Sequence, residues 1–291
     1  MNSFRIIFLM LALVVVFMGA GYLVGGRSGM ILAFMLACVM NFLTYWFSDR
    51  MVLRMYRARE ITEADHPRFY RVVKRVTTQA MIPMPKVCIV PSKAPNAFAT
   101  GRNLEHAAVA VTEGLLGLLS EDELEGVIGH EIAHIMNKDM LIGTIAATFA
   151  GAIGILALIA RWGAIFGGYG RSNDNRGGGI GLLIAAIVAP LVAMVIQMAI
   201  SRQREYKADR QGGRITGKPA ALASALSKLH RAPIRMNLDR QPATASLMIV
   251  NPLSGKGMSS LFSTHPPVEK RIEKLNKLAE ELPYQQGYAG I

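Results

Sequence analysis

His130 and His134 stand four residues apart in the motif HEIAH, and Glu131 follows the first histidine. On a helix this spacing puts both imidazoles on one face, a turn apart, where they can bind one Zn²⁺. Glu131 lies beside the first ligand, so its carboxylate can reach a metal-bound water and act as a general base. The motif predicts a hydrolytic centre with one zinc per chain.

A catalytic zinc needs a third protein ligand and leaves its fourth position to water. The sequence around the motif, HEIAHIMNKDM, lacks the third histidine of the metzincin pattern, so the third ligand must come from another part of the chain. Ser120 and Glu123 form the pattern of a capping box at the start of the helix that carries the motif. The elements around this helix decide where the third ligand lies.

Apolar runs are the most prominent of these elements. Four of them reach the length of about 20 residues that crosses a bilayer, namely 6–24, 30–47, 141–160 and 180–200. The stretch GGRSG at 25–29 closes a first hairpin, because it is too short to hold a domain and too rich in glycine to continue a helix. The polar, glycine-rich residues 161–179 close a second hairpin. The sequence predicts a mainly α membrane protein with four transmembrane helices.

Composition supports a membrane protein, since 52% of the residues are hydrophobic. A net charge of +12 is also typical of nucleic-acid-binding proteins, but the basic residues cluster near the ends of the apolar runs, as expected for anchors at an anionic membrane face. We expect a lipid bilayer and no nucleic acid as a partner. The two cysteines, Cys38 and Cys88, give no disulfide framework.

The topology follows from the even number of spans and from the basic residues. Those that follow the second and fourth spans are Arg50, Arg54, Arg57, Arg59, Arg202, Arg204 and Lys207. By the positive-inside rule, both chain ends and both longer segments are therefore cytoplasmic. Two membrane hairpins, 1–47 and 141–200, thus alternate with two cytoplasmic segments, 48–140 and 201–291, which together form one domain.

The cytoplasmic segments contain both strand and helix patterns. We expect a helix at 62–81 and then short strands in KVCIVPS, NAFATG and AAVAVTEG, which are β-branched or small apolar runs between Pro and Gly. In the second segment, AALASALSKLH and PPVEKRIEKLNKLAEEL carry apolar residues at helical spacing. The cytoplasmic domain is therefore predicted to be of the α+β class.

The second membrane hairpin suggests the third ligand. Glu205 lies five residues after the fourth span, and His134 lies seven before the third. If both helices continue outward, both residues stand roughly 8–10 Å above the same membrane face. Asp209, one turn further along, reaches the height of His130 and can accept a hydrogen bond from its imidazole. We prefer Glu205 as the zinc ligand and Asp209 as the residue that supports a ligating imidazole from outside, although the heights also allow the reverse assignment. This geometry requires an unbroken helix through residues 137–139.

Four stretches together resemble the HtpX group of bacterial membrane zinc metalloproteases: HEIAH before a span, SRQREYKAD after the next span, NAFATG and STHPP. The resemblance covers essentially the whole chain, and the wider family includes the prenyl-protein (CAAX) endoproteases, with a gluzincin fold. It implies that Glu205 is the third zinc ligand and Asp209 an outer residue. It also implies that Asn96, Ala97 and Phe98 belong to an active-site edge strand that pairs with extended substrate.

His265 in STHPP matches a family element that lies close to the active site. The resemblance implies contact with the site, through Asp209 or as an oxyanion donor, whereas a lone histidine before two prolines is also typical of a turn. The resemblance further implies a zinc endopeptidase of the bacterial inner membrane with a stress-response role in protein quality control. Its substrates would be misfolded or damaged membrane proteins and unfolded soluble proteins, and homo-oligomers or quality-control partners are compatible with it.

Two other functions stay open. A membrane-anchored zinc-binding scaffold or regulator would keep the metal site without proteolysis, but Glu131 argues against it, because a structural zinc site needs no base. A dedicated processing protease would trim one substrate class, such as a lipidated C-terminus, inside a membrane chamber. Four spans are too few to enclose a large chamber, which favours an open site reached from the cytoplasm.

Overall fold

The fold is given by a computed structural model that describes residues 2–143, 145, 202–232 and 266–288. The chain divides into two compact units, one of residues 1–47 with 142–199 and one of residues 48–141 with 200–291. The predicted fourth span, the loop 161–179, nearly all of the predicted third span and His265 lie outside the described residues.

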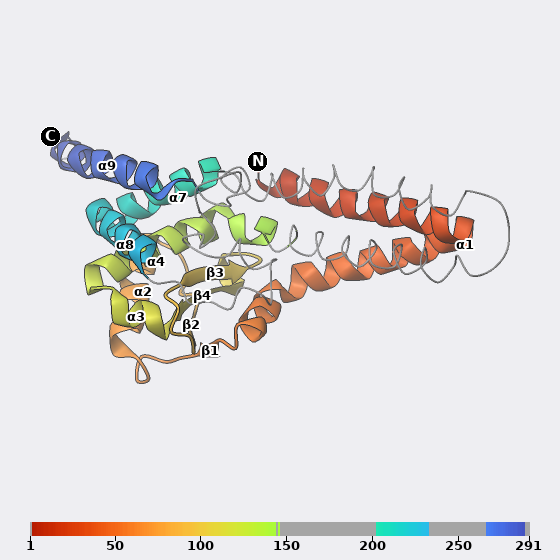
Figure 1. The fold of residues 1–291 in the computed structure, drawn as a ribbon, viewed down its shortest axis with the longest axis horizontal. Helices are drawn as coiled ribbons and strands as arrows, with labels where there is room; N and C mark the ends of the chain where they lie inside the picture. The colour runs from red at the N-terminus through yellow and green to blue at the C-terminus, as the bar shows by residue number, and fades with distance from the viewer. Residues whose placement is uncertain (1, 144, 146–201, 233–265, 289–291) are drawn as a thin grey trace. The chain divides into compact units, whose positions relative to one another are not determined.

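Helix α1 (Asn2–Met55) forms a hairpin rather than one straight rod (Figure 1). The chain reverses near Gly26, whose φ of +58° is readily adopted only by glycine. The Asn41 side chain then donates a hydrogen bond of 3.1 Å to the Met10 carbonyl on the other arm. We expected residues 25–29 to interrupt the helix, and this was wrong in detail, because helical structure runs up to the turn on both sides.

Within the described residues, one helical segment is long and apolar enough to cross a membrane, namely Gly26–Met55. Its 30 residues span about 45 Å, which exceeds the hydrocarbon thickness of about 30 Å. The apolar arm before it, Ile6–Tyr22, is shorter. The last turns of α1, from Ser48, belong to the second unit, which also carries the HEIAH motif.

The second unit contains one sheet, in the order β1-β2-β4-β3. Its strands are β1 (Arg59–Glu60), β2 (Lys86–Val90), β3 (Ala97–Gly101) and β4 (Ala107–Thr112). The last three are the strands predicted from the sequence. Strand β4 pairs parallel with β2 and antiparallel with β3, so β4 is central and fully buried while β3 lies at an edge.

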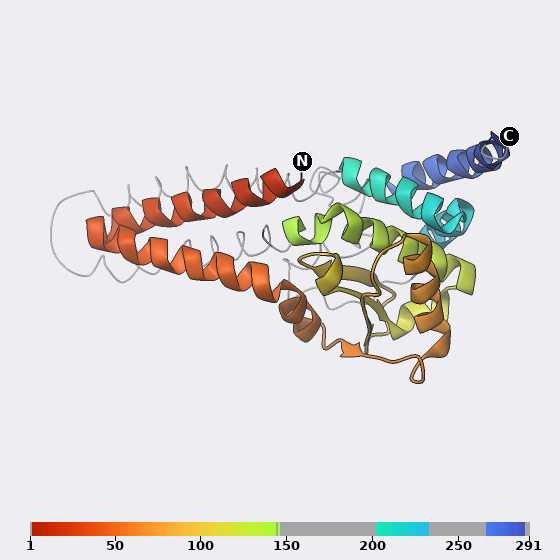
Figure 2. The same cartoon turned by 180° about the vertical axis from the view of Figure 1, so that it is seen from behind.

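The helices of this unit are α2 (Pro67–Gln79), α3 (Glu113–Leu118), α4 (Glu121–Asn137), α7 (Arg202–Thr216), α8 (Pro219–Arg231) and α9 (Val268–Tyr288), and the short 3-10 helix η1 (Leu104–His106) precedes β4. Helix α4 packs on β3 and β4, α7 and α8 pack on α4, and α9 packs on α7 and α8 (Figures 1 and 2). The main core joins apolar side chains of α2, α4 and α8 to Val109 and Val111 of β4. A smaller cluster on the other face joins Phe98 of β3 to Val52 and Tyr56 at the end of α1.

Helix α4 begins as predicted and ends earlier than predicted. Ser120 and Glu123 form the capping box, with each side chain accepting a hydrogen bond from the other residue's backbone N–H. At the other end, Lys138 has φ +57° and ψ +26°, which is the left-handed conformation. A new helical stretch then covers residues 139–143. The expected unbroken helix through residues 137–139 was therefore wrong, and the membrane spans do not fix the height of His134 through one continuous rod.

Candidate metal centre

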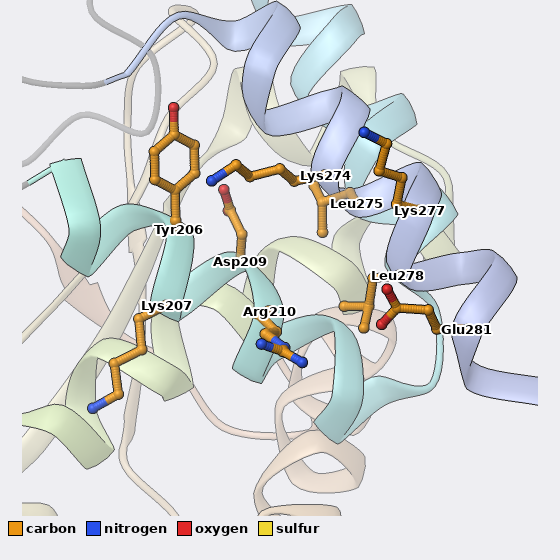
Figure 3. Close-up of a pocket in the computed structure, with 9 residues that line it drawn as sticks. All are labelled: Tyr206, Lys207, Asp209, Arg210, Lys274, Leu275, Lys277, Leu278 and Glu281. Atoms are coloured by element: carbon orange, nitrogen blue, oxygen red, sulfur yellow. The ribbon is translucent and has the colours of Figure 1, made fainter. Parts of the chain in front are cut away.

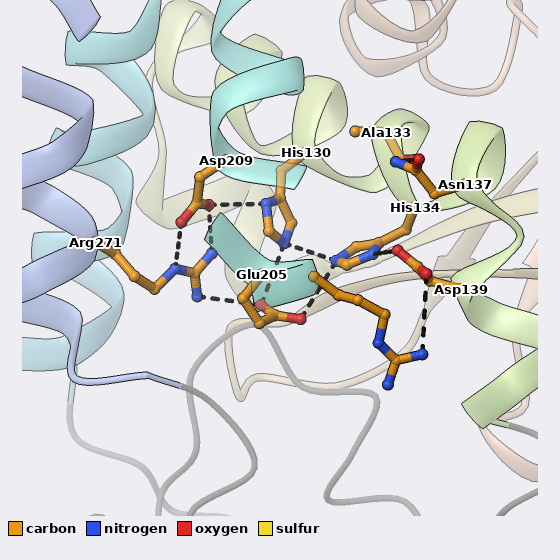
Figure 4. Close-up of polar contacts among 9 residues, drawn as sticks. His130, Ala133, His134, Asn137, Asp139, Glu205, Asp209 and Arg271 are labelled. Atoms are coloured by element: carbon orange, nitrogen blue, oxygen red, sulfur yellow. Dashed lines mark hydrogen bonds and ion pairs between the residues drawn. The ribbon is translucent and has the colours of Figure 1, made fainter. Parts of the chain in front are cut away.

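His130 and His134 face the same point from one side of α4 (Figure 4). Their Nε2 atoms are 3.1 Å apart, and the two rings stand at right angles to each other. His130 is only 2% exposed. Two ring nitrogens that converge at this distance in a buried place are typical of ligands for one cation.

Glu205, in the first turn of α7, completes the cluster. Its Oε1 lies 3.5 Å from His134 Nε2, and its Oε2 lies 3.7 Å from His130 Nε2. A tetrahedral zinc with bonds of about 2.0–2.2 Å holds its ligand atoms about 3.3–3.6 Å apart. The three residues each offer one atom, all within 4.8 Å of one another. Two imidazoles and a carboxylate at these separations fit a zinc ion.

The approach of α7 to α4 depends on two glycines. A Cβ on Gly212 would stand 2.6 Å from the Gly129 carbonyl carbon and 2.6 Å from the His130 nitrogen. A Cβ on Gly129 would stand 2.6 Å from Thr216 Cγ2. The backbones therefore touch one residue before His130, and this contact brings the α7 carboxylates within reach of the α4 imidazoles.

Asp209 lies one turn after Glu205 and contacts the outer side of His130. Its Oδ1 is 2.9 Å from His130 Nδ1, the ring nitrogen that faces away from the cluster. Arg271 of α9 donates two hydrogen bonds of 2.7 Å to the same carboxylate. Burial raises the pKa of Asp209, but Arg271 and His130 outweigh burial and lower it to about 2. Asp209 is therefore a permanent carboxylate behind His130.

Asp139 takes the equivalent place beside His134. Its Oδ2 is 3.1 Å from His134 Nδ1, and Arg204 Nη1 lies 3.9 Å from its other oxygen. Burial lowers the pKa of His134, but the carboxylates of Asp139, Glu205 and Glu131 outweigh burial and raise it to about 9. The cluster thus has a negative field that favours a positive charge between its ligand atoms.

Family comparison agrees with this geometry. The family model described as Peptidase family M48 matches residues 63–279. The chain belongs to peptidase family M48. It is similar to a protease HtpX homologue of Desulfatibacillum aliphaticivorans, at 53% identity over 94% of this chain and 89% of that one. It is also similar to one of Thermococcus kodakarensis, at 54% identity over 94% of this chain and 95% of that one.

The fold of this M48 chain is also similar to that of a solved structure, Ste24p of S. mikatae, with a TM-score of 0.52 at 21% identity. The match covers 83% of this chain and 57% of that one. The family and its relatives establish that the chain is a metalloprotease and that polypeptides are its substrates. With the apolar segment Gly26–Met55, they indicate a membrane protein.

Glu131 of this peptidase is only 5% exposed. Its charge contributes to the raised pKa of His134 and, with Asp209 and Glu205, to the raised pKa of the buried Arg271. The Glu131 carboxylate is therefore buried and near enough to His134 and Arg271 to affect their pKa values.

The predicted substrate strand lies at the sheet edge. Asn96 precedes β3 and exchanges backbone and side-chain hydrogen bonds with Thr112, which fixes the start of the strand. Ala97 is fully buried against the main core, and Phe98 points to the other face, where its ring lies 4.7 Å from that of Tyr56. The side chains of β3 thus serve packing.

A pocket of about 430 Å³ opens between α7 and α9, beyond Asp209 (Figure 3). Its lining residues are Tyr206, Lys207, Asp209, Arg210, Lys274, Leu275, Lys277, Leu278 and Glu281. The Lys274 ammonium lies 3.7 Å from the centre of the Tyr206 ring. The pocket has a basic rim, and one of its lining residues, Asp209, also contacts His130 of the metal cluster.

Sequence reasoning missed Arg271 and Asp139. Arg271 stands between Val268 and Leu275 at helical spacing, so it occupies the apolar stripe of α9, and a charge on a buried stripe is the signal that could have found it. Asp139 gave no such signal, because on the expected continuous helix it would point away from His134.

Proposed function

We propose that this metalloprotease is a zinc-dependent endopeptidase of the bacterial inner membrane. His130, His134 and Glu205 would hold one Zn²⁺, and Glu131 would be the general base. The observation that carries the proposal is the buried convergence of two Nε2 atoms and one carboxylate beside Glu131. A bound zinc supplies Lewis acidity, which lowers the pKa of a coordinated water and polarises a carbonyl.

Each residue of the site then has one task. Glu131 takes a proton from the attacking water and delivers it to the leaving amine. The Asp209 carboxylate, 2.9 Å from His130 Nδ1, would fix the orientation of that ring and so keep Nε2 directed at the metal. His265 is placed in the proposal as a contact of Asp209 or as an oxyanion donor, on the family resemblance alone.

The substrate would bind as an added strand on β3, at Asn96, Ala97 and Phe98. Support comes from the position of β3 at the edge of the sheet. Strand addition uses main-chain hydrogen bonds and reads little side-chain identity. Extended segments of misfolded or damaged membrane proteins, and of unfolded soluble proteins, are therefore the proposed substrates. In this proposal the chain crosses the membrane four times, with both ends and the protease domain in the cytoplasm.

The decisive experiment uses the zinc-loaded, detergent-solubilised full chain. It is incubated with an unfolded soluble protein and with a membrane protein, beside a Glu131→Gln variant. We expect cleavage by the original protein and none by Glu131→Gln, which keeps a full zinc complement by elemental analysis. Glu121→Gln is the matched control, since Glu121 is a half-exposed residue of the same helix, and it should cleave normally.

Two outcomes would contradict the proposal. Turnover by Glu131→Gln would remove Glu131 as the base, and absence of cleavage by the original protein would favour a zinc-binding scaffold. The ligand assignment is tested separately with Glu205→Ala, which should lose zinc. Strand addition is tested with a peptide substrate that is N-methylated at alternate residues, which should bind weakly because it lacks backbone donors.

A further inference from the structure

The chain turns sharply where α4 ends, directly after the metal-binding motif. Lys138 is left-handed, and its N–H donates to the carbonyls of His134 and Ile135. The turn is anchored to α7, because Asn137 donates 2.8 Å to Gln211 and accepts 2.6 Å from Lys207. Such side-chain anchors hold the backbone in a conformation that residues with a Cβ rarely adopt.

The turn changes which residue reaches His134. On a continuous helix, residue 139 would stand about 140° around the axis from residue 134, on a different face. The left-handed residue redirects the chain, so that Asp139 Oδ2 comes to 3.1 Å from His134 Nδ1 (Figure 4). Only 8% of the Asp139 side chain is exposed, and Arg204 Nη1 lies 3.9 Å from its second oxygen.

We propose that Asp139 is the positioning carboxylate of His134, and that the left-handed turn at Lys138 exists to deliver it. A histidine that binds a metal through Nε2 carries its proton on Nδ1, and a carboxylate at Nδ1 fixes that tautomer and the ring orientation. Asp209 stands in the same relation to His130. Each imidazole of the cluster thus has its own carboxylate, one from α7 and one from the turn after α4. The inference rests on the proposed role of His134 as a zinc ligand.

A simpler role for Asp139 is available, because an acidic residue in the first turn stabilises a helix by interacting with its dipole. That role would affect the stability of the 139–143 stretch and leave zinc binding unchanged. The buried contact with His134, 3.1 Å long, favours the positioning role, and zinc affinity separates the two.

The test measures zinc dissociation constants by competition with a chromophoric chelator, on the full chain in detergent. We expect Asp139→Ala to bind zinc about 10–100-fold more weakly than the original protein does. Asp139→Asn keeps an acceptor oxygen, so its zinc affinity should lie between those of the original protein and Asp139→Ala. Asp122→Ala removes a largely exposed aspartate from α4 and should bind as the original protein does. Unchanged affinity in both Asp139 variants would overturn the proposal.

The turn is tested by a pair of substitutions at Lys138. Lys138→Gly removes the side chain and suits a positive φ, so zinc affinity should be retained. Lys138→Val opposes the left-handed conformation and should weaken zinc binding at least several-fold, since Asp139 is then misdirected. Equal affinities in the two variants would show that the turn does not deliver Asp139.

Two further measurements separate positioning from folding and from the ligand assignment. The Co²⁺-substituted Asp139→Ala protein should show a shifted visible absorption spectrum, which a purely structural role would not produce. His134→Ala should lose tight zinc binding. If it does not, the ligand assignment itself is wrong. If His134→Ala loses zinc while Asp139→Ala and Asp139→Asn do not, only the positioning proposal fails.

Discussion

The Arg271 guanidinium binds the Asp209 carboxylate through two hydrogen bonds of 2.7 Å, and no part of Arg271 is exposed to solvent. Its third nitrogen, Nη1, lies 3.6 Å from Glu205 Oε2. One arginine of α9 thus contacts both carboxylates that α7 presents to the cluster. Planar, bidentate geometry of this kind is specific to arginine.

Removing the Arg271 guanidinium should therefore destabilise the second unit, residues 48–141 with 200–291. Arg271→Leu leaves the buried Asp209 carboxylate without its arginine partner, and we expect the free energy of unfolding to fall by about 3–5 kcal/mol. Arg271→Lys keeps the charge but loses the paired hydrogen bonds, so its loss should be smaller. Urea unfolding in detergent, followed by circular dichroism, measures both. The double variant Arg271→Leu with Asp209→Asn should recover part of the loss, and no recovery would mean that the ion pair is not the cause.

Helix packing at the cluster gives a second prediction. Gly212→Ala places a methyl group 2.6 Å from the backbone of Gly129 and His130, so α7 must move away from α4. We expect a loss of about 1–3 kcal/mol in unfolding free energy, together with weaker zinc binding, because Glu205 moves with α7. Gly117→Ala is the matched control, since nothing lies within 4 Å of a Cβ there. Unchanged zinc content in Gly212→Ala would show that the glycine contact does not set the ligand geometry.

The Glu123 carboxyl, at the start of α4, should make the stability of the fold depend on pH. Burial raises the pKa of this carboxyl, but hydrogen bonds from Lys228, Ser120 and Ser224 outweigh burial and lower it from 4.5 to about 2. Because the pKa is lower in the folded chain, the ionised group stabilises the fold fully above about pH 4.5. This contribution is lost as the pH falls through about 2.

The measurement is the unfolding free energy of the metal-free protein between about pH 2 and 6, so that zinc release does not contribute. Stability should decline with falling pH, and Glu123→Gln should show a shallower decline across the same range. An equal slope in the two proteins would mean that Glu123 is not responsible.

The aromatic contact between Tyr56 and Phe98 links the end of α1 to β3. Tyr56→Ala should lower the free energy of unfolding by about 1–3 kcal/mol and raise KM for peptides more than it lowers kcat, because β3 is the proposed substrate strand. Tyr56→Phe retains the ring and should resemble the original protein. If Tyr56→Ala leaves KM unchanged, the contact serves packing alone.

Local patterns in the sequence were sufficient to predict several structural elements. The capping box at Ser120 and Glu123 is a relation across three residues, and the HEIAH spacing is one across four, so neither depends on distant parts of the chain. Strands β2, β3 and β4 were recognisable as short apolar runs between turn residues. The order β1-β2-β4-β3, with β3 at the edge, comes from pairing between distant segments and could not be read from those runs.

The sequence by itself thus determined a helix with two histidines on one face, an acidic candidate in SRQREYKAD, and a strand pattern before the motif. Tertiary structure decided how the cluster is assembled. Glu205 meets the histidines because two glycines let α7 touch α4, and α4 does not continue unbroken into residues 139–143, since Lys138 interrupts it. Arg271 reaches Asp209 through a contact between residues 62 positions apart. Asp139 reaches His134 because Lys138 has a left-handed backbone conformation. Spacing along the chain encodes neither, because both arise only when separate elements pack.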